Sequence, residues 1–177
     1  YDGRLHRQID SVETSFLSAI DPEAGAEIWR VEHDEDSNWS SPMIWRNRLR
    51  TELVTQGART RSYDPETGMQ HWELFVQGGR NSSSPVVNQD LLFLGNEKRA
   101  AGGYLFAVRA GVRGDISVSE GQTSSAGVAW INPNGGVVMA GCIGGVVMAG
   151  CIGGVVMAEY IGGAVRSENV GGAVMAE

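Results

Sequence analysis

The chain has 177 residues, of which 42% are hydrophobic and 20% charged, and is therefore long and apolar enough for one globular domain with its own core. Its formal net charge of −7 argues against nucleic-acid binding, because neutralising phosphates requires a positively charged surface. Many of the 25 glycines crowd the last quarter, so that composition divides the chain into two parts.

The sequence contains neither a visible signal peptide nor a membrane span. No apolar run reaches the roughly 18 residues of a transmembrane helix without being interrupted by glycine. The only cysteines, Cys142 and Cys151, lie in the glycine-rich part. No disulfide framework is therefore expected in the first part.

Seven short segments rich in β-branched or aromatic residues are predicted to be strands, and glycine, proline, asparagine and aspartate separate them. In chain order they cover residues 16–20, 27–31, 49–54, 59–63, 71–76, 91–94 and 104–108. No sustained helical periodicity is present. The sequence therefore predicts an all-β fold.

A motif repeats along these strands at a spacing of 43 residues. The aligned pairs are Asp21 and Asp64, Gly25 and Gly68, and Trp29 and Trp72. A fainter third copy begins with YLFAV at Tyr104, and Trp130 is predicted to be its closing tryptophan, after a longer insertion. A period of 40–45 residues with several short strands is typical of β-propeller blades. We expect a partial propeller of about three antiparallel four-stranded blades in residues 1–134.

The repeated turn has a physical rationale in Asp-Pro-Glu-Thr-Gly, from Asp64 to Gly68. Proline presets φ at the second position, and glycine accepts a positive φ where the hairpin closes. The aspartate can accept hydrogen bonds from backbone amides just ahead of it. Trp72 then lies on the next strand, where its ring is expected to wedge between adjacent blades.

These residues resemble the tryptophan-docking motif of pyrroloquinoline-quinone-like (PQQ-like) propeller repeats. The motif residues are Asp21, Gly25 and Trp29 in one copy and Asp64, Thr67, Gly68 and Trp72 in the next. The first copy departs from the motif at Ala24, which is usually threonine, and the second at Ser62, which is usually alanine. The resemblance covers about Phe16 to Gly136 and is similar to the group that includes the propeller of the outer-membrane barrel-assembly lipoprotein.

The resemblance implies a non-enzymatic scaffold that presents loops to an unidentified protein partner, located in the periplasm or outside the cell. It also implies a fragment of a larger design, because about three blades cannot close a ring, and Tyr1–Leu5 is expected to be an outer strand. Such a piece is expected to associate with itself through exposed blade edges or through the glycine-rich tail.

The alternative implied by the resemblance is a fragment of a quinone-dependent dehydrogenase. Those enzymes use a quinone on the propeller axis, a carboxylate base, a bound calcium ion and a disulfide between adjacent cysteines. Cys142 and Cys151 are instead nine residues apart. We therefore assign no catalytic, cofactor-binding or metal-binding residue and expect no cofactor.

Other candidate metal ligands have simpler interpretations. Asp34, Asp36 and Asn38 alternate like the start of a calcium loop, but Trp39 and Trp45 occupy the positions that need glycine and glutamate. The histidines, His6, His33 and His71, lack metal-ligand spacing. The methionines and cysteines of the tail could favour Cu(I), but copying one unit produces the same series.

Residues 135–177 form a tail with the nonapeptide period GGVVMAGCI. Its repeats lack the aspartate of calcium-binding β-rolls, and an uncharged, β-prone repeat is a candidate for cross-β stacking. The tail is expected to be either disordered or a small β-solenoid. A self-assembling structural protein driven by this tail is the third functional hypothesis.

Overall fold

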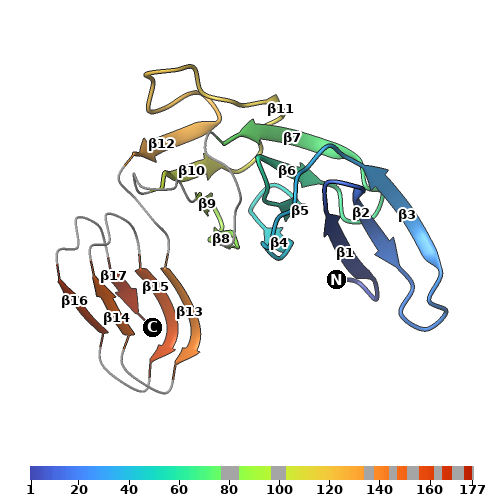
Figure 1. Cartoon of the computed structure of the whole chain (residues 1–177), viewed down its shortest axis with the longest axis horizontal. Coiled ribbons are helices and arrows are strands. Elements are labelled where there is room, and N and C mark those ends of the chain that lie inside the picture. Colours follow the sequence, from blue (N-terminus) through green and yellow to red (C-terminus); the bar gives the residue numbers. More distant parts are fainter. Residues whose placement is uncertain are drawn as a thin grey trace.

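The computed structural model describes residues 1–76, 84–96 and 103–133, together with the backbone of five strands between residues 138 and 176. Every helix or strand element in the described residues is a strand (Figure 1). The predicted all-β class is therefore confirmed. In the same part of the chain no helix has the length and hydropathy needed to cross a membrane.

Residues up to 133 form three sheets, and apart from β11 each sheet takes its strands in chain order. The first contains β1 (Leu5–Asp10), β2 (Ser15–Ile20) and β3 (Glu27–Glu32). The second contains β4 (Met43–Arg46), β5 (Thr51–Thr55), β6 (Arg59–Tyr63) and β7 (Gln70–Phe75), with β11 (Gly114–Asp115) added beside β7. The third contains β8 (Val86–Val87), β9 (Leu91–Gly95), β10 (Leu105–Arg109) and β12 (Val128–Asn132).

All pairings in these sheets are antiparallel except that of β11 with β7. The sheets differ in size from the four strands expected of each, because the first has three and the second has five. The expectation of a strand at Tyr1–Leu5 is wrong: Arg4 donates its backbone N–H to the Tyr1 carbonyl in a turn, and β1 begins only at Leu5.

The repeat is exact in strand register. Opposite each motif tryptophan lies a small residue of the preceding strand: Ala19 with Trp29, Ser62 with Trp72, and Ala107 with Trp130. A register shift follows directly after the small residue in every case. This common geometry confirms Trp130 as the tryptophan of the third copy, although the insertion separates it from β10.

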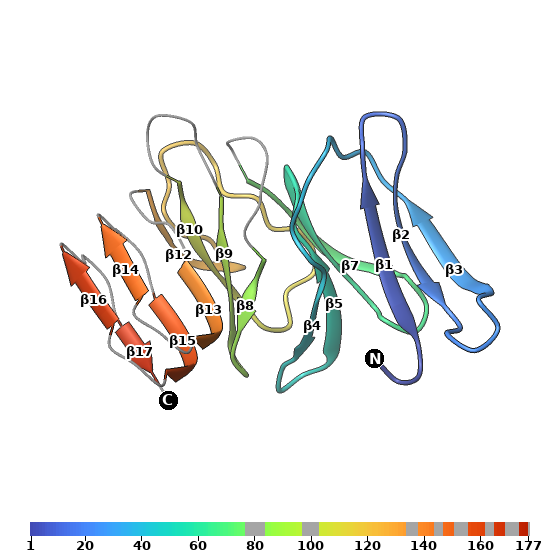
Figure 2. The same ribbon diagram turned by 60° about the horizontal axis from the view of Figure 1, so that its bottom comes forward.

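The three sheets stand face to face in a row (Figure 2). Between the first and second lies a core of Leu17, Leu53 and Tyr63, with Trp29, Val31 and Ile44 packed against it. Between the second and third lies a larger core that includes Trp45, Val54, Trp72, Leu92 and Val108. Each inner sheet face is apolar because alternate strand residues point to it.

The described strands of the tail pair in parallel. β13 (Val138–Ile143), β15 (Val156–Ile161) and β17 (Val174–Ala176) form one sheet, and β14 (Val147–Gly150) and β16 (Val165–Glu168) form another. Paired residues, such as Val138 and Val156, lie two nonapeptides apart in sequence.

Candidate functional site

The two clear motif turns have the same backbone geometry. Asp21 accepts hydrogen bonds from the amides of Glu23 and Ala24, and Asp64 accepts them from Glu66 and Thr67. The glycines donate back to the aspartate carbonyls, at 2.8 Å for Gly25 and 2.9 Å for Gly68. Their φ angles are +66° and +76°, the left-handed conformation predicted for them.

Thr67 adds one bond that Ala24 cannot make. Its hydroxyl accepts a hydrogen bond from the Met69 amide at 3.3 Å. Partial burial raises the pKa of Asp64, but the hydrogen bonds from Thr67 and Glu66 outweigh this effect and hold the pKa below its usual value. The second turn is therefore the more completely satisfied of the two.

Trp29 of the first sheet lies directly on Gly68 in the turn of the second sheet. A Cβ atom built on Gly68 would lie 2.8 Å from Trp29 Cε3 and 3.0 Å from a methyl group of Val31. His6 supports the indole from β1, with ring centroids 5.8 Å apart, and bonds to the Pro65 carbonyl at 2.9 Å. The turn glycine therefore serves both the turn and the contact between sheets.

Trp72 is fully buried between the second and third sheets, and its indole is anchored by the carboxylate of Glu52. The indole Nε1–H donates to Glu52 Oε2 at 2.7 Å, and Ser62 donates to the same oxygen. Asn47 donates to Oε1 at 2.8 Å, and the Arg50 guanidinium forms an ion pair with it at 3.1 Å. The serine that departs from the motif thus donates a hydrogen bond to the buried Glu52 carboxylate.

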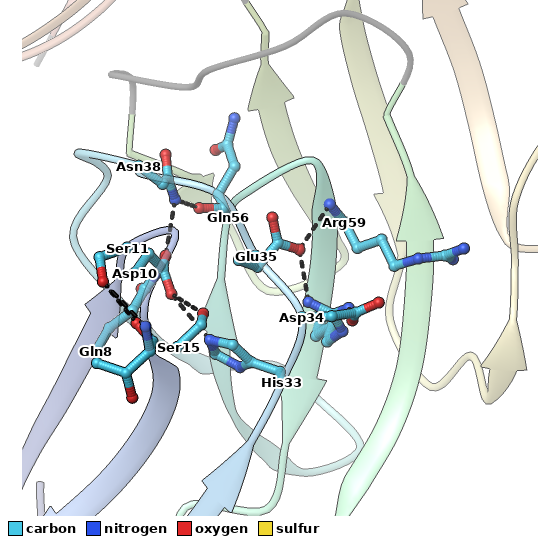
Figure 3. A network of polar contacts seen from close by, with 12 residues as sticks. Gln8, Asp10, Ser11, Ser15, His33, Asp34, Glu35, Asn38, Gln56 and Arg59 are labelled. Atoms are coloured by element: carbon cyan, nitrogen blue, oxygen red, sulfur yellow. Dashed lines mark hydrogen bonds and ion pairs between the residues drawn. The ribbon is translucent and has the colours of Figure 1, made fainter.

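A second polar network joins β1 to the segment between the first two sheets (Figure 3). The Asp10 side chain is 2% exposed, and its Oδ1 lies 2.8 Å from His33 Nε2. Gln8 and Asn38 also donate to this carboxylate. Burial raises the pKa of Asp10, but these hydrogen bonds outweigh the burial and lower the pKa overall.

Glu35 fixes the same segment to the second sheet. Its carboxylate accepts hydrogen bonds from the amides of Ala58 and Arg59, at 2.7 and 2.9 Å, and from Arg61 at 2.6 Å. Both members of the Glu35–Arg61 ion pair are buried, with side chains 3% and 4% exposed. Removing either partner would leave an uncompensated buried charge, which is strongly destabilising.

Two of the three residues that alternate like the start of a calcium loop make contacts within the chain. Asp34 pairs with Arg61 at 2.7 Å, and Asn38 donates to Asp10 and to the Gln56 carbonyl. Within the described residues no three histidine, cysteine, aspartate or glutamate side chains gather as a metal site. The side chains of Cys142 and Cys151 lie outside the described part of the chain.

An open hollow of about 410 Å³ lies beside the insertion between β10 and β12. Its apolar wall is formed by Phe75, Tyr104, Phe106 and Ile131. Its rim is formed by the insertion, with Val118 and residues 119–123, and by Pro133. Phe75 is 47% exposed, and Glu120 supplies a carboxylate. The hollow thus combines an apolar floor with a polar rim that carries one carboxylate.

Sequence reasoning identified the motif turns and tryptophans but missed the buried polar residues. Asp10, His33, Glu35, Glu52 and Arg61 were not singled out as partners. The available signal was the charge of Glu52 beside Leu53 and Val54 in a predicted strand. A charge at such a position requires partners, although the sequence does not name them.

The repeated register, the turn glycines and the docked tryptophans define a PQQ-like repeat protein of the propeller type. The family model described as outer membrane protein assembly factor BamB matches residues 13–173, and the chain belongs to this family. The match extends into the glycine-rich repeats, beyond the point near Gly136 where the motif resemblance ended.

Solved structures of two kinds are similar to the chain. Quinohemoprotein alcohol dehydrogenase from Comamonas testosteroni is 20% identical with a TM-score of 0.49, and the alignment covers 64% of this chain and 19% of that one. BamB from Moraxella catarrhalis is 17% identical with a TM-score of 0.47, over 73% of this chain and 33% of that one. The chain thus spans a third or less of these proteins. None of the curated proteins matches it at a significant level.

Proposed function

We propose that this chain is a non-enzymatic scaffold of the bacterial envelope that binds a protein partner through the loops of its sheets. The observation that carries the proposal is its membership of a family described as outer membrane protein assembly factors. The same description favours a location in the periplasm, at the outer membrane. On this proposal residues 1–134 are three blades of a propeller, and residues 135–177 are an accessory tail built as a small β-solenoid.

The internal chemistry of the motif residues supports a structural role for them. Asp21, Gly25, Asp64, Thr67 and Gly68 shape turns, and the tryptophans Trp29 and Trp72 pack between sheets. The turn aspartates, the Thr67 hydroxyl and the Trp72 indole all make their hydrogen bonds within the chain. The hollow beside the insertion is the proposed contact site, because it combines exposed aromatic surface with an acidic rim.

The test is binding of the full chain to a purified outer-membrane assembly complex from which its own propeller subunit has been removed. Glu120→Lys reverses the charge at the rim of the hollow and is expected to weaken binding at least about tenfold. Glu66→Lys reverses an equally exposed charge on a distant turn and should leave affinity unchanged. Equal affinity for both variants would remove the hollow from the proposal.

The enzymatic alternative is tested on the same preparation. The full chain is incubated with pyrroloquinoline quinone, calcium, a primary alcohol and a redox dye. The proposal predicts no dye reduction above that of the quinone alone. Turnover that depends on the chain would contradict it and would favour the dehydrogenase fragment.

A further inference from the structure

The first two sheets carry opposite charges at equivalent positions. Arg4, directly before β1, corresponds to Glu52 in β5. In the first sheet the residue paired with Ala19 follows Arg4 by two positions. In the second sheet the residue paired with Ser62 follows Glu52 by two positions. Since Ala19 and Ser62 each lie opposite the docked tryptophan of their sheet, a guanidinium in the first sheet takes the place of a carboxylate in the second.

Two buried donor atoms of the first sheet have no acceptor. They are Nε1 of Trp29 and Nη1 of Arg4, and within the described residues neither has a hydrogen-bond partner. The equivalent indole of the second sheet, Trp72, donates to Glu52 Oε2 at 2.7 Å. A donor that is removed from water and left unpaired destabilises a fold. The first sheet thus lacks an acceptor where the second sheet has a carboxylate.

The second sheet shows which acceptor suits such a pair of donors. Glu52 accepts the Trp72 N–H through Oε2, and its Oε1 lies 3.1 Å from Nε of Arg50. One carboxylate therefore joins an indole to a guanidinium, because its two oxygens can each serve one of them. The first sheet contains the indole and the guanidinium of this arrangement without the carboxylate.

His6 relates the two donors in space. Its ring centroid lies 5.8 Å from that of Trp29, and its Nε2 lies 2.9 Å from the Pro65 carbonyl. Burial lowers the pKa of His6, the Pro65 hydrogen bond opposes this effect, and the positive charges of the amino terminus and of Arg4 add to it. Arg4 and Trp29 are each only half-buried. The two donors therefore lie at the margin of the space between the sheets, where a ligand can reach them.

We propose that Arg4 and Trp29 bind one carboxylate group supplied from outside the chain. One of its oxygens accepts the Trp29 indole N–H, and the other pairs with the Arg4 guanidinium. The carboxylate belongs either to a small organic acid or to an acidic side chain of another protein, and the same two donors recognise both. This site goes beyond the scaffold function and does not depend on it.

The test follows the indole N–H resonances of the full chain in two-dimensional ¹H–¹⁵N spectra. Trp29→Phe identifies the Trp29 resonance among those of the five tryptophans. Sodium acetate then replaces sodium chloride at constant ionic strength. The Trp29 resonance is expected to move and to saturate, while that of Trp72 stays in place, because its acceptor is internal. A Trp29 resonance that acetate leaves unchanged would overturn the proposal.

Substitutions at Arg4 separate binding from a general effect of acetate. Arg4→Gln is expected to weaken acetate binding at least about tenfold, because it removes the charged donor. Arg7→Gln is the matched control, since Arg7 lies over the Phe16 ring and pairs with Glu27. It should leave the acetate response unchanged. An equal response in Arg4→Gln and in the unaltered chain would contradict the site.

Arg4→Glu supplies the carboxylate from within the chain, as Glu52 does in the second sheet. The Trp29 resonance is expected to move downfield without acetate and then to give no further response, with far-UV circular dichroism confirming the fold. A full acetate response in this variant would also overturn the proposal.

A blocked Gly-Glu-Gly peptide distinguishes the two sources of the carboxylate, with its Gly-Gln-Gly counterpart as control. Binding at least about tenfold tighter than acetate would support the site and assign it to a protein side chain. Equal affinity would support the site and assign it to a free organic acid. Equal responses to the glutamate and glutamine peptides would contradict recognition of a carboxylate.

Discussion

Gly25 and Gly68 occupy the same position of the same turn and differ only in what lies above them. Both have a positive φ, and both donate to the carbonyl of the motif aspartate. Only Gly68 lies under the Trp29 indole. Substituting each glycine in turn therefore distinguishes the free-energy cost of the backbone conformation from the stabilisation that the tryptophan contact provides.

Gly25→Ala is expected to cost about 1–2 kcal/mol of unfolding free energy, because an L-residue is strained at positive φ. Gly68→Ala is expected to cost about 1–3 kcal/mol more, because its methyl group would collide with Trp29. Urea denaturation of both variants measures the difference. Equal costs would mean that the indole moves away freely and that the docking contact contributes little.

Trp72→Phe tests the anchor beneath the second tryptophan. Phenylalanine keeps most of the apolar contact but removes the indole donor from the buried Glu52 carboxylate, at an expected cost of about 1–3 kcal/mol. Trp39→Phe is the control, because Trp39 is 60% exposed and its replacement should change stability by less than about 0.5 kcal/mol. Comparable effects of the two substitutions in denaturation would contradict the anchoring role of Glu52.

The sequence predicted residues whose role is local and missed those whose role depends on distant partners. Asp64 and Gly68 act within one turn, so that their residue types and spacing were sufficient. Glu52 and Trp72 lie 20 residues apart, and Asp10 and His33 lie 23 apart. Such pairs depend on which strands are neighbours in a sheet and on the register between them. Neither can be read directly from one amino-acid sequence.

At the scale of elements, the insertion between β10 and β12 clasps the neighbouring sheet. Its short strand β11 pairs in parallel with β7, the Ile116 amide donates to the Glu73 carbonyl at 2.9 Å, and Ser117 accepts from the Phe75 amide. The sequence predicted an insertion here but not a strand, because two residues carry no periodicity. The clasp covers the outer edge of the second sheet, which would otherwise be open to pairing.

Ile116 ties this clasp to the core and is 8% exposed. Ile116→Ala is expected to destabilise the chain by about 2–4 kcal/mol through a cavity between the second and third sheets. Ser119→Ala, at an exposed position of the same insertion, should change stability by less than about 0.5 kcal/mol. If thermal unfolding gave similar values for both, the insertion would be a detached loop rather than a clasp.

The network that joins Asp10 of β1 to the segment between the first and second sheets gives stability an acid-sensitive component. The pKa of Asp10 is lowered in the folded chain, so its contribution is fully present above the unfolded pKa of about 3.9 and is lost as pH falls through the folded value. Asp10→Asn cannot titrate. The stability difference between the unaltered chain and this variant is therefore expected to shrink as pH falls below about 4. A difference independent of pH down to 2.5 would contradict the role of this carboxylate.

At the scale of the whole molecule, three sheets of similar design are joined in series by repeated contacts. The register of Ala19, Ser62 and Ala107 with their tryptophans is constant, whereas the material between sheets varies from a buried ion pair to a clasping insertion. The period of 43 residues was enough to predict the repetition. It could not predict the three-stranded first sheet or the fifth strand of the second, because these depend on pairing between segments that the repeat does not relate.

Tryptophan docking and the buried polar contacts are expected to make these sheets one cooperative unit. Native-state hydrogen exchange of the full chain tests it through the amides of the interior strands β2, β6 and β10. The account predicts one shared free energy of opening for all three strands, with one shared dependence on denaturant. Three separate values, one for each sheet, would show that the sheets open independently and would contradict the claim.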